Sequence, residues 1–288
     1  PQCAWLQKPC NGLKGNTIKI SCLIDYGALD GFKSKHGLSL WIEACGHKFL
    51  FDTGETDAFL ANAKALGIDI GEAEFCVISH GHHDHGGGIR AFFDANKHAR
   101  VYVREGAFGP RYSNKPGEGK RYIGIDASLQ GGKRIVETGE RCEICPGILL
   151  FSGVTGNELH SPANDVLMGA DGETPDEFAH EQNMLIAEGE RRVLIAGCAH
   201  RGIANIMRRA LELSGGKLDA VIGGMHLAIP GTSDINIPLV DGTADYLLAS
   251  PGTVYYTGHC TGLGSFARLQ EHMGERVKYL HAGESIEL

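Results

Sequence analysis

The chain has 288 residues, of which 42% are hydrophobic, so it can bury one large core or two small ones, and we expect a single domain over residues 1–288. The formal net charge of −8 argues against a general affinity for nucleic acid or anionic membranes, although a local basic pocket could accept an anionic small-molecule substrate. The sequence shows neither a membrane-length apolar run nor a signal-peptide pattern at Pro1, which favours the cytoplasm.

The first apolar runs predict β-strands at residues 18–24, 38–44 and 48–51. The third strand ends at Asp52, and a helix is predicted shortly after it. Taken alone, Asp52 could cap that helix. His36 lies in the loop before the second strand, where it is either a surface residue or part of a pocket wall.

The most informative stretch is residues 79–88, Ser-His-Gly-His-His-Asp-His-Gly-Gly-Gly, between a predicted strand at 75–78 and a predicted helix at 89–93. Four histidines and one aspartate within six residues are costly to pack without a metal, because each ring nitrogen would need another partner. The flanking glycines permit the sharp turn on which closely spaced ligands converge. We therefore predict a metal site at this loop. A solvated His-rich loop is the weaker alternative.

Two stretches with little hydrophobic periodicity, at about residues 107–147 and 156–179, are predicted insertions. Such segments lie on the surface or form a lid over a site. Tyr112, Arg121 and Tyr122 would suit a lid.

The cysteines are odd in number and spread along the chain, which favours reduced thiols over a disulfide framework. Cys142 and Cys145 form a lone C-x-x-C pair. A structural zinc site there would need the distant Cys3 and Cys10, so ordinary thiols are the default.

Strand ends in the second half of the chain carry further candidate ligands. A predicted strand at 193–196 leads to Cys198 and His200, whose side chains point the same way in an extended backbone. Both are candidate metal ligands, against the alternatives of a buried core cysteine and a helix-capping histidine. The strand at 218–222 leads to His226, which is predicted either to contact substrate or bind metal, or to be a packed structural histidine.

The strand at 253–256 leads to His259, the candidate for the last metal ligand. A glycine-rich segment follows it and precedes a predicted helix at 266–272. Free backbone N–H groups near Thr261 and Gly262 could therefore bind a phosphate or carboxylate of the substrate. An ordinary helix start capped by Ser265 is the more common alternative.

The spacing H-x-H-x-D-H, carried by His80, His82, Asp84 and His85, resembles the signature of the metallo-β-lactamase superfamily. The resemblance implies that the first pair binds one metal and the Asp–His pair a second. It also implies that a strand-end aspartate, here Asp52, orients the metal loop.

In the same family a third histidine, a bridging aspartate and a last histidine follow in that order. His180, Cys198 and His259 have comparable order and spacing. A cysteine at the bridging position departs from the common pattern, because a thiolate can ligate zinc but cannot reproduce a bridging carboxylate. His200 is the alternative to His180.

The whole set of motifs, over residues 52–262, is similar to a branch of 7,8-dihydropterin-6-methyl-4-(β-D-ribofuranosyl)aminobenzene-5′-phosphate synthase-like proteins. The resemblance implies an α/β (α+β) fold, the four-layered αββα sandwich with two mixed sheets face to face and helices outside. The ligand-bearing loops would then all come from strand ends.

The function expected from this site is that of a metal-dependent hydrolase acting on a small ester, phosphoester or lactone. One or two Zn²⁺ ions are expected, with Mn²⁺ or Fe²⁺ as alternatives, and the bound metal would make hydroxide available at neutral pH. Asp84 would be the proton acceptor if the second metal were absent.

A synthase or transferase of pterin-related metabolism is the alternative implied by the branch. A di-iron oxidoreductase is another. It is disfavoured because His82 stands where those members place a carboxylate, and imidazole suits zinc better. Binding without catalysis would follow if Cys198 closed the coordination sphere.

Overall fold

Apolar runs along the chain pair into two large β-sheets that pack face to face in the computed structural model, which describes residues 17–288. The first sheet has the strand order β17-β1-β2-β3-β4-β5-β8. Its strands are β1 (Lys19–Ile24), β2 (Ser39–Ala44), β3 (His47–Phe51), β4 (Phe75–Val77), β5 (Arg100–Arg104), β8 (Ile135–Thr138) and β17 (Ser285–Glu287). From β3 to β8 the neighbouring strands are parallel.

The second sheet has the order β16-β15-β14-β13-β12-β10-β9. Its strands are β9 (Arg141–Cys145), β10 (Ile148–Phe151), β12 (Asn183–Glu188), β13 (Arg191–Ile195), β14 (Ala220–Ile222), β15 (Val254–Thr257) and β16 (Val277–Tyr279). From β13 to β16 the strands are again parallel. Each sheet therefore has one half whose strand ends point to the same edge.

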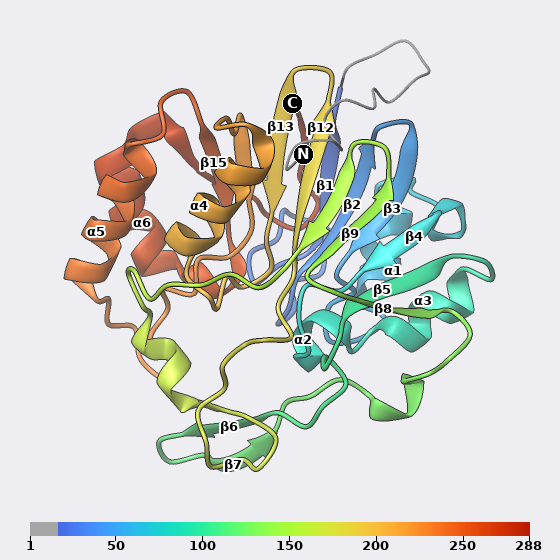
Figure 1. Ribbon diagram of the computed structural model, residues 1–288, viewed down its shortest axis with the longest axis horizontal. Helices are drawn as coiled ribbons and strands as arrows, with labels where there is room; N and C mark the ends of the chain where they lie inside the picture. Colours follow the sequence, from blue (N-terminus) through green and yellow to red (C-terminus); the bar gives the residue numbers. More distant parts are fainter. Residues whose placement is uncertain (1–16) are drawn as a thin grey trace.

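Helices cover the outer face of each sheet, which gives the four layers predicted from the resemblance (Figure 1). On the first sheet lie α1 (Ala58–Ala65) and α3 (Ile89–Ala95), and on the second α4 (Ile203–Ser214), α5 (Ile237–Leu248) and α6 (Leu263–Met273). The one-turn helix α2 (His83–Gly86) lies in the loop between β4 and α3. Side chains such as Phe49, Phe51 and Ile195, all fully buried, fill the space between the sheets. Two further apolar clusters lie between the sheets and their helices. The predicted α/β sandwich is confirmed.

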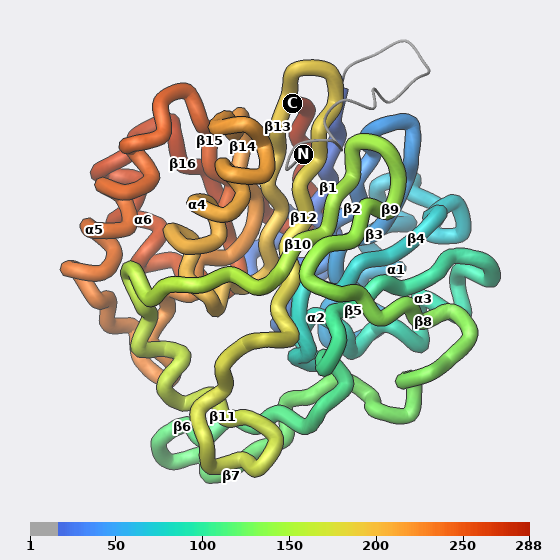
Figure 2. The backbone as a smooth tube through the Cα atoms, viewed as in Figure 1, coloured from blue at the N-terminus to red at the C-terminus, as the bar shows by residue number. Residues whose placement is uncertain are grey.

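The two predicted insertions meet in a third, three-stranded sheet (Figure 2). β6 (Tyr112–Lys115) and β7 (Gly119–Tyr122) come from the first insertion, and β11 (Leu167–Met168) comes from the second and pairs with β6. We call these three strands the lid sheet. The first insertion is shorter than predicted, because β8 and β9 lie at the edges of the two large sheets. Edge strands bury little surface, so their apolar pattern is weak.

The start of the last long helix differs from the prediction, and two cysteines considered for a zinc site lie outside residues 17–288. The last long helix, α6, begins at Leu263 and includes Ser265, whose hydroxyl donates to the Leu227 carbonyl 3.2 Å away instead of capping the helix. Cys3 and Cys10 fall outside the described residues. Between residues 17 and 288 the chain forms no helix that is both long and apolar enough to cross a membrane.

Asn96, which is fully buried, joins the end of α3 to the turn before β4 and to the residue before β5. Its side-chain amide donates to the carbonyls of Ile70 and Ala73, and its oxygen accepts from the Ala99 N–H at 2.7 Å. The substitution Asn96→Ala would leave these groups unpaired, so we expect the free energy of unfolding to fall by about 2–4 kcal/mol in urea titrations. Asn114→Ala, at an exposed position, is the control and should change it by less than about 0.5 kcal/mol. Equal stability of the two variants would contradict this role.

Candidate metal centre

The histidine-bearing loops leave the carboxyl ends of parallel strands in both sheets. The metal loop, residues 79–88, follows β4, and other loops follow β13, β14 and β15. β3 and β4 are parallel neighbours, as are β13, β14 and β15. Because such strands end at a common edge, side chains more than a hundred residues apart in sequence meet there.

The imidazole rings of His80, His82 and His200 face one another at nearly equal separations. The ring centroids are 4.6 Å apart for His80 and His82, 4.8 Å for His80 and His200, and 4.9 Å for His82 and His200, and each pair is close to perpendicular. The Nε2 atoms of His80 and His200 are 3.3 Å apart. The buried Nε2 of His82 has no hydrogen-bond partner among residues 17–288. We call these three residues the three-histidine cluster.

Asp84, His85, Cys198 and His259 form a second cluster beside it, which we call the mixed cluster. His85 Nε2 lies 3.1 Å from His259 Nε2 and 3.2 Å from Cys198 Sγ. Asp84 Oδ2 lies 3.5 Å from His85 Nε2 and 3.4 Å from His259 Nε2. The Cys198 sulfur also lies within 4.8 Å of the ligand atoms of His80 and His200. Cys198 therefore stands between the two clusters, at the position the family resemblance gives to a bridging aspartate.

Hydrogen bonds behind the rings fix where their protons lie. The Ser79 hydroxyl donates its proton to Asp52 Oδ2. His80 Nδ1 lies 2.9 Å from Ser79 Oγ and must therefore donate to Ser79 Oγ. His200 Nδ1 donates to the Asn164 side-chain oxygen at 2.9 Å, while the Asn164 amide donates to the His200 carbonyl. His80 and His200 thus turn Nε2 lone pairs toward each other.

Facing lone pairs repel each other unless a cation lies between them. A tetrahedral metal with nitrogen ligands at about 2.0–2.1 Å holds those nitrogens roughly 3.3 Å apart, which matches the 3.3 Å between Nε2 of His80 and Nε2 of His200. The unpartnered Nε2 of His82 points to the same conclusion. The donor set, imidazole nitrogen with thiol and carboxylate nearby, fits a metal ion such as zinc.

Asp52 lies beneath the metal loop and is fully buried. Its Oδ1 accepts the Ser79 N–H, and its Oδ2 accepts from the Ser79 hydroxyl and from His85 Nδ1, each at 2.7 Å. These bonds leave His85 Nε2 as a lone pair directed into the mixed cluster. The residue before α1 is Asp57, so Asp52 orients the loop and does not cap that helix.

Asp25, which the sequence reasoning missed, holds the backbone of the loop that carries the last histidine. Its carboxylate accepts the His259 N–H at 2.6 Å and the Tyr279 hydroxyl at 2.8 Å. Asp25 follows strand β1 as Asp52 follows β3, and each begins an Asp-x-Gly triplet. That repeated strand-end triplet is the signal that could have identified it.

His180 is held away from the three-histidine cluster by its own hydrogen bonds. Its Nδ1 accepts the Gly81 N–H at 2.9 Å, and its Nε2 lies 3.0 Å from Asp176 Oδ2. Both of its ring nitrogens are engaged, although its ligand atom and those of His82 and Asp176 lie within 4.8 Å of one another. The ring of His200 lies nearer to that of His82, at 4.9 Å between centroids against 5.5 Å for His180. Glu181, the neighbour of His180, accepts the backbone N–H of His200 at 2.7 Å, which fixes that residue in turn.

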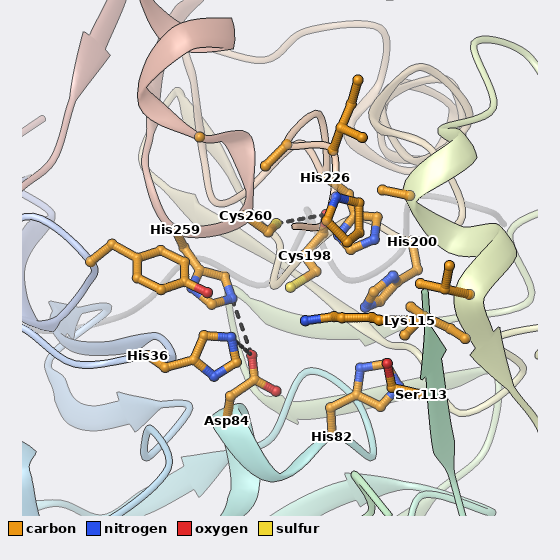
Figure 3. Close-up of a pocket in the computed structure, with 18 of the residues that line it drawn as sticks. His36, His82, Asp84, Ser113, Lys115, Cys198, His200, His226, His259 and Cys260 are labelled. Carbon is orange, nitrogen blue, oxygen red and sulfur yellow. Dashed lines mark hydrogen bonds and ion pairs between the residues drawn. The ribbon is translucent and has the colours of Figure 1, made fainter. Parts of the chain in front are cut away.

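The predicted substrate contacts divide into two groups. His226 and Gly262 line the cavity described below, and His226 lies against the thiol of Cys260, a residue the sequence reasoning did not select (Figure 3). Thr261 is fully buried, and its hydroxyl accepts the Met225 N–H at 2.9 Å. Its prediction as a substrate contact is corrected: Thr261 ties the loops after β14 and β15 together.

Backbone strain gathers in the same loops. Asp52, Ala199, His226 and His259 have φ angles between 47° and 60°, in the left-handed region that non-glycine residues rarely adopt. Each such residue costs on the order of 1–3 kcal/mol and persists only where surrounding contacts hold it. The site is therefore rigidly held by its scaffold.

Electrostatics set the protonation states of the site. Burial lowers the pKa values of His80, His82 and His200 well below their usual range, so these rings are neutral, the form that binds metals. Burial also lowers the pKa of His259, but the hydrogen bond with Asp84 together with the negative charges of Cys260, Asp84 and Asp25 raises that pKa to about 9. A cation bound in the mixed cluster would compete with this proton.

The clusters form the floor of a cavity of about 450 Å³ (Figure 3). His36, left open by the sequence, lines this cavity, with Nε2 3.7 Å from Asp84 Oδ2. Tyr26 stacks on His259 with ring centroids 5.2 Å apart and also lines it. The cavity is large enough for a small molecule and opens directly over the candidate ligands.

Comparison with known proteins gives a consistent result. The family model of the metallo-beta-lactamase superfamily matches residues 35–259. Two curated proteins of Methanocaldococcus jannaschii are similar over nearly the whole chain. An uncharacterized protein is 28% identical over 271 residues, covering 93% of this chain and 99% of its own length. A 7,8-dihydropterin-6-methyl-4-(beta-D-ribofuranosyl)-aminobenzene-5′-phosphate synthase is 27% identical over 292 residues, covering 95% and 97%.

Solved structures show the same likeness. The crystal structure of a metal-dependent hydrolase of the beta-lactamase superfamily superposes with a TM-score of 0.75 at 28% identity, covering 94% of this chain and 99% of that one. The metallo-beta-lactamase fold protein YhfI of Bacillus subtilis has a TM-score of 0.59 at 15% identity, covering 95% and 100%. The second likeness concerns the fold alone.

Proposed function

The chain belongs to the metallo-β-lactamase superfamily, and from this premise we propose that it is a metal-dependent hydrolase acting on a small ester, phosphoester or lactone. The observation that carries the proposal is the set of three mutually perpendicular imidazoles, His80, His82 and His200, of which His82 and His200 line an accessible cavity. Structural metal sites are usually closed by four protein ligands, whereas catalytic sites keep a position open to solvent or substrate.

His80, His82 and His200 would hold a first zinc ion, and Asp84, His85 and His259 a second, with Cys198 within reach of both. A bound divalent metal lowers the pKa of a water ligand toward ~7 and polarises a substrate carbonyl or phosphoryl oxygen. The chain's own contribution is to orient the ligand rings and their loops, through the hydrogen bonds of Asp52 to the His85 ring, of Asn164 to the His200 ring and of Asp25 to the His259 backbone.

Asp84 is the residue we propose for proton transfer. Its carboxylate lines the cavity, and its pKa, which burial raises, is held well below the usual range by the neighbouring His85 and His259. It is therefore ionised at neutral pH and, if the second metal position is empty, can accept a proton from an attacking water on the cavity side. His36, 3.7 Å away, can pass that proton toward solvent because it is partly exposed.

A synthase of pterin-related metabolism is the second candidate, favoured by the M. jannaschii relative of that name. At 27% identity the likeness leaves the reaction of this chain open, and the same cavity and ligand set could serve either reaction. A di-iron oxidoreductase is the third. Elemental analysis separates it from the others, because stoichiometric iron with a visible absorption band would favour it over zinc.

The metal requirement gives a direct test. We expect purified protein to hydrolyse at least one of nitrophenyl acetate, bis-nitrophenyl phosphate and a γ-lactone, to lose this activity after dialysis against a chelator, and to regain it with Zn²⁺. Elemental analysis before and after dialysis shows whether metal content follows activity. Metal-replete protein that turns over none of these substrates, with ligand variants that behave identically, would count against a hydrolase.

A further inference from the structure

The lid sheet turns one face of β6 toward the cavity. Ser113 and Lys115 lie two residues apart on this strand and line the cavity, whereas Asn114 between them is exposed. Alternate residues of a strand point to opposite faces, so the two inward side chains share one face. The lid sheet thus brings one hydroxyl and one amine over the metal centre from a segment outside the two large sheets.

Lys115 differs from the other basic residues of the lid sheet. Arg121 pairs with Glu118 at 2.7 Å, and Lys120 donates to the Asp171 carbonyl at 2.9 Å. Across the described part of the chain, no carboxylate pairs with the Lys115 amine. Figure 3 shows this side chain extended into the cavity among the candidate ligands. Its positive charge is therefore available to a bound molecule.

Ser113 supplies a second polar group that lacks a protein partner. The side chain is 4% exposed, and its hydroxyl has no hydrogen-bond partner within residues 17–288. A buried hydroxyl left unpaired costs about 1–3 kcal/mol, so such groups normally meet a ligand or an ordered water. Here the hydroxyl faces the same cavity as the Lys115 amine.

The rest of the cavity wall is largely apolar. Ile229 and Pro230 line it, and the exposed side chains of Tyr26 and Leu263 lie at its edge, with 47% and 67% of their surface accessible. Large apolar side chains exposed beside a cavity are typical of a surface that a ligand covers. The wall therefore suits an apolar or aromatic body next to the polar groups.

We propose that Ser113 and Lys115 form an oxyanion-recognition site facing the metal centre, and that the substrate carries a phosphate or carboxylate on an apolar or aromatic body. This inference rests on the proposed function, since it assigns the substrate class of the same cavity. The Lys115 amine and Ser113 hydroxyl hold the anion, and Tyr26 and Leu263 contact the body. Because the formal net charge is −8, most of the surface repels anions, and an anionic molecule would bind preferentially at the Lys115 amine.

Calorimetry on the zinc-loaded full chain tests this site without requiring turnover. The probes are phenylphosphonate, benzoate and the neutral benzamide. We expect Lys115→Met to weaken phenylphosphonate or benzoate binding about 10- to 100-fold and to leave benzamide binding unchanged, because a charge-assisted hydrogen bond is lost. Lys115→Arg should retain most of the affinity, and Ser113→Ala should lose less than Lys115→Met. The anion that loses more affinity in Lys115→Met identifies the group recognised.

Lys133→Met is the matched control, because it removes the same charge from an exposed position in the same insertion. Zinc content and thermal unfolding of every variant establish that the fold and the metal centre are intact. Equal anion affinity for Lys115→Met and Lys133→Met would overturn the oxyanion site. If the protein hydrolyses neutral esters and the two variants bind anions equally, the proposed hydrolase activity would stand and the oxyanion site would not. Anion binding that depends on Lys115, in a protein without hydrolytic activity, would support the oxyanion site and count against the hydrolase.

Discussion

Replacing His82 by alanine is expected to lower hydrolytic activity by about three orders of magnitude and to reduce bound zinc. Replacing the adjacent His83, which also lines the cavity, should leave bound zinc unchanged and lower the rate far less. A metal ion contributes several kcal/mol to the stabilisation of a transition state, and each 1.36 kcal/mol is tenfold in rate. The His82 ring faces those of His80 and His200, and its buried Nε2 has no protein partner between residues 17 and 288. Its loss removes one of three imidazoles from the first metal position.

His83 is the matched control for this prediction. It has the same side chain and stands next in the same motif, yet its ring is about one-third exposed, with Nε2 3.4 Å from Glu55. Zinc content by elemental analysis and initial rates with the best substrate of the hydrolase panel measure both variants. A His82→Ala protein that keeps full zinc and full rate, or a His83→Ala protein that loses both, would show that the ligand set is wrong.

The sequence predicts the part of this site that is local along the chain. Four ligands lie within six residues, so their spacing alone indicates a metal, and His259 and Cys198 follow because each stands just after an apolar strand. What spacing could not decide was the third histidine. His180 fits the family order and His200 lies two residues beyond Cys198, so the sequence offered both, and only the hydrogen bonds of His180 to Gly81 and Asp176 show that its nitrogens are engaged.

Residues that act by position in space were harder to predict. Lys115 lies in a stretch without periodicity, and its importance comes from the pairing of β6 with β11, which joins two insertions about fifty residues apart. The sequence had favoured Tyr112, Arg121 and Tyr122 for a lid. Tyr122 is 51% exposed, Arg121 pairs with Glu118, and the lid-sheet residues that line the cavity are Ser113, Lys115 and Leu167. Which face of a short strand points inward depends on register, and weak apolar alternation does not reveal it.

Asp52 and Asp25 support the ligand-bearing loops from similar positions in the first sheet. Asp52 and Asp25 each end a strand of the first sheet and accept hydrogen bonds from a ligand-bearing loop. A buried carboxylate that accepts several hydrogen bonds is held in one position and acts as a fixed anchor. The loops therefore owe their strained conformations at His259 and Asp52 to two carboxylates held by the rigid β-sheet.

The substitution Asp52→Asn is expected to weaken zinc binding about 10- to 100-fold, the usual effect of losing a hydrogen-bond partner of a metal-binding histidine. Asparagine has the same size and tolerates the left-handed φ of 60° at this position, so the change isolates the carboxylate. Asp52 Oδ1 accepts the Ser79 N–H, and Oδ2 accepts from His85 Nδ1. An amide keeps one acceptor oxygen, so its NH₂ group would face His85 Nδ1. The His85 proton would then shift to Nε2 and block the nitrogen that faces the metal.

Competition with a chromophoric chelator measures the zinc affinity, and urea titration of the metal-free protein measures the fold separately. Asp57→Asn is the control, because Asp57 is exposed and its side chain makes no capping hydrogen bond to α1. It should leave zinc affinity unchanged. Because His85 acts through Nε2, the double variant Asp52→Asn with His85→Ala should bind zinc no more weakly than His85→Ala alone. Additive losses would mean that Asp52 acts on the metal by a route other than the proton of His85.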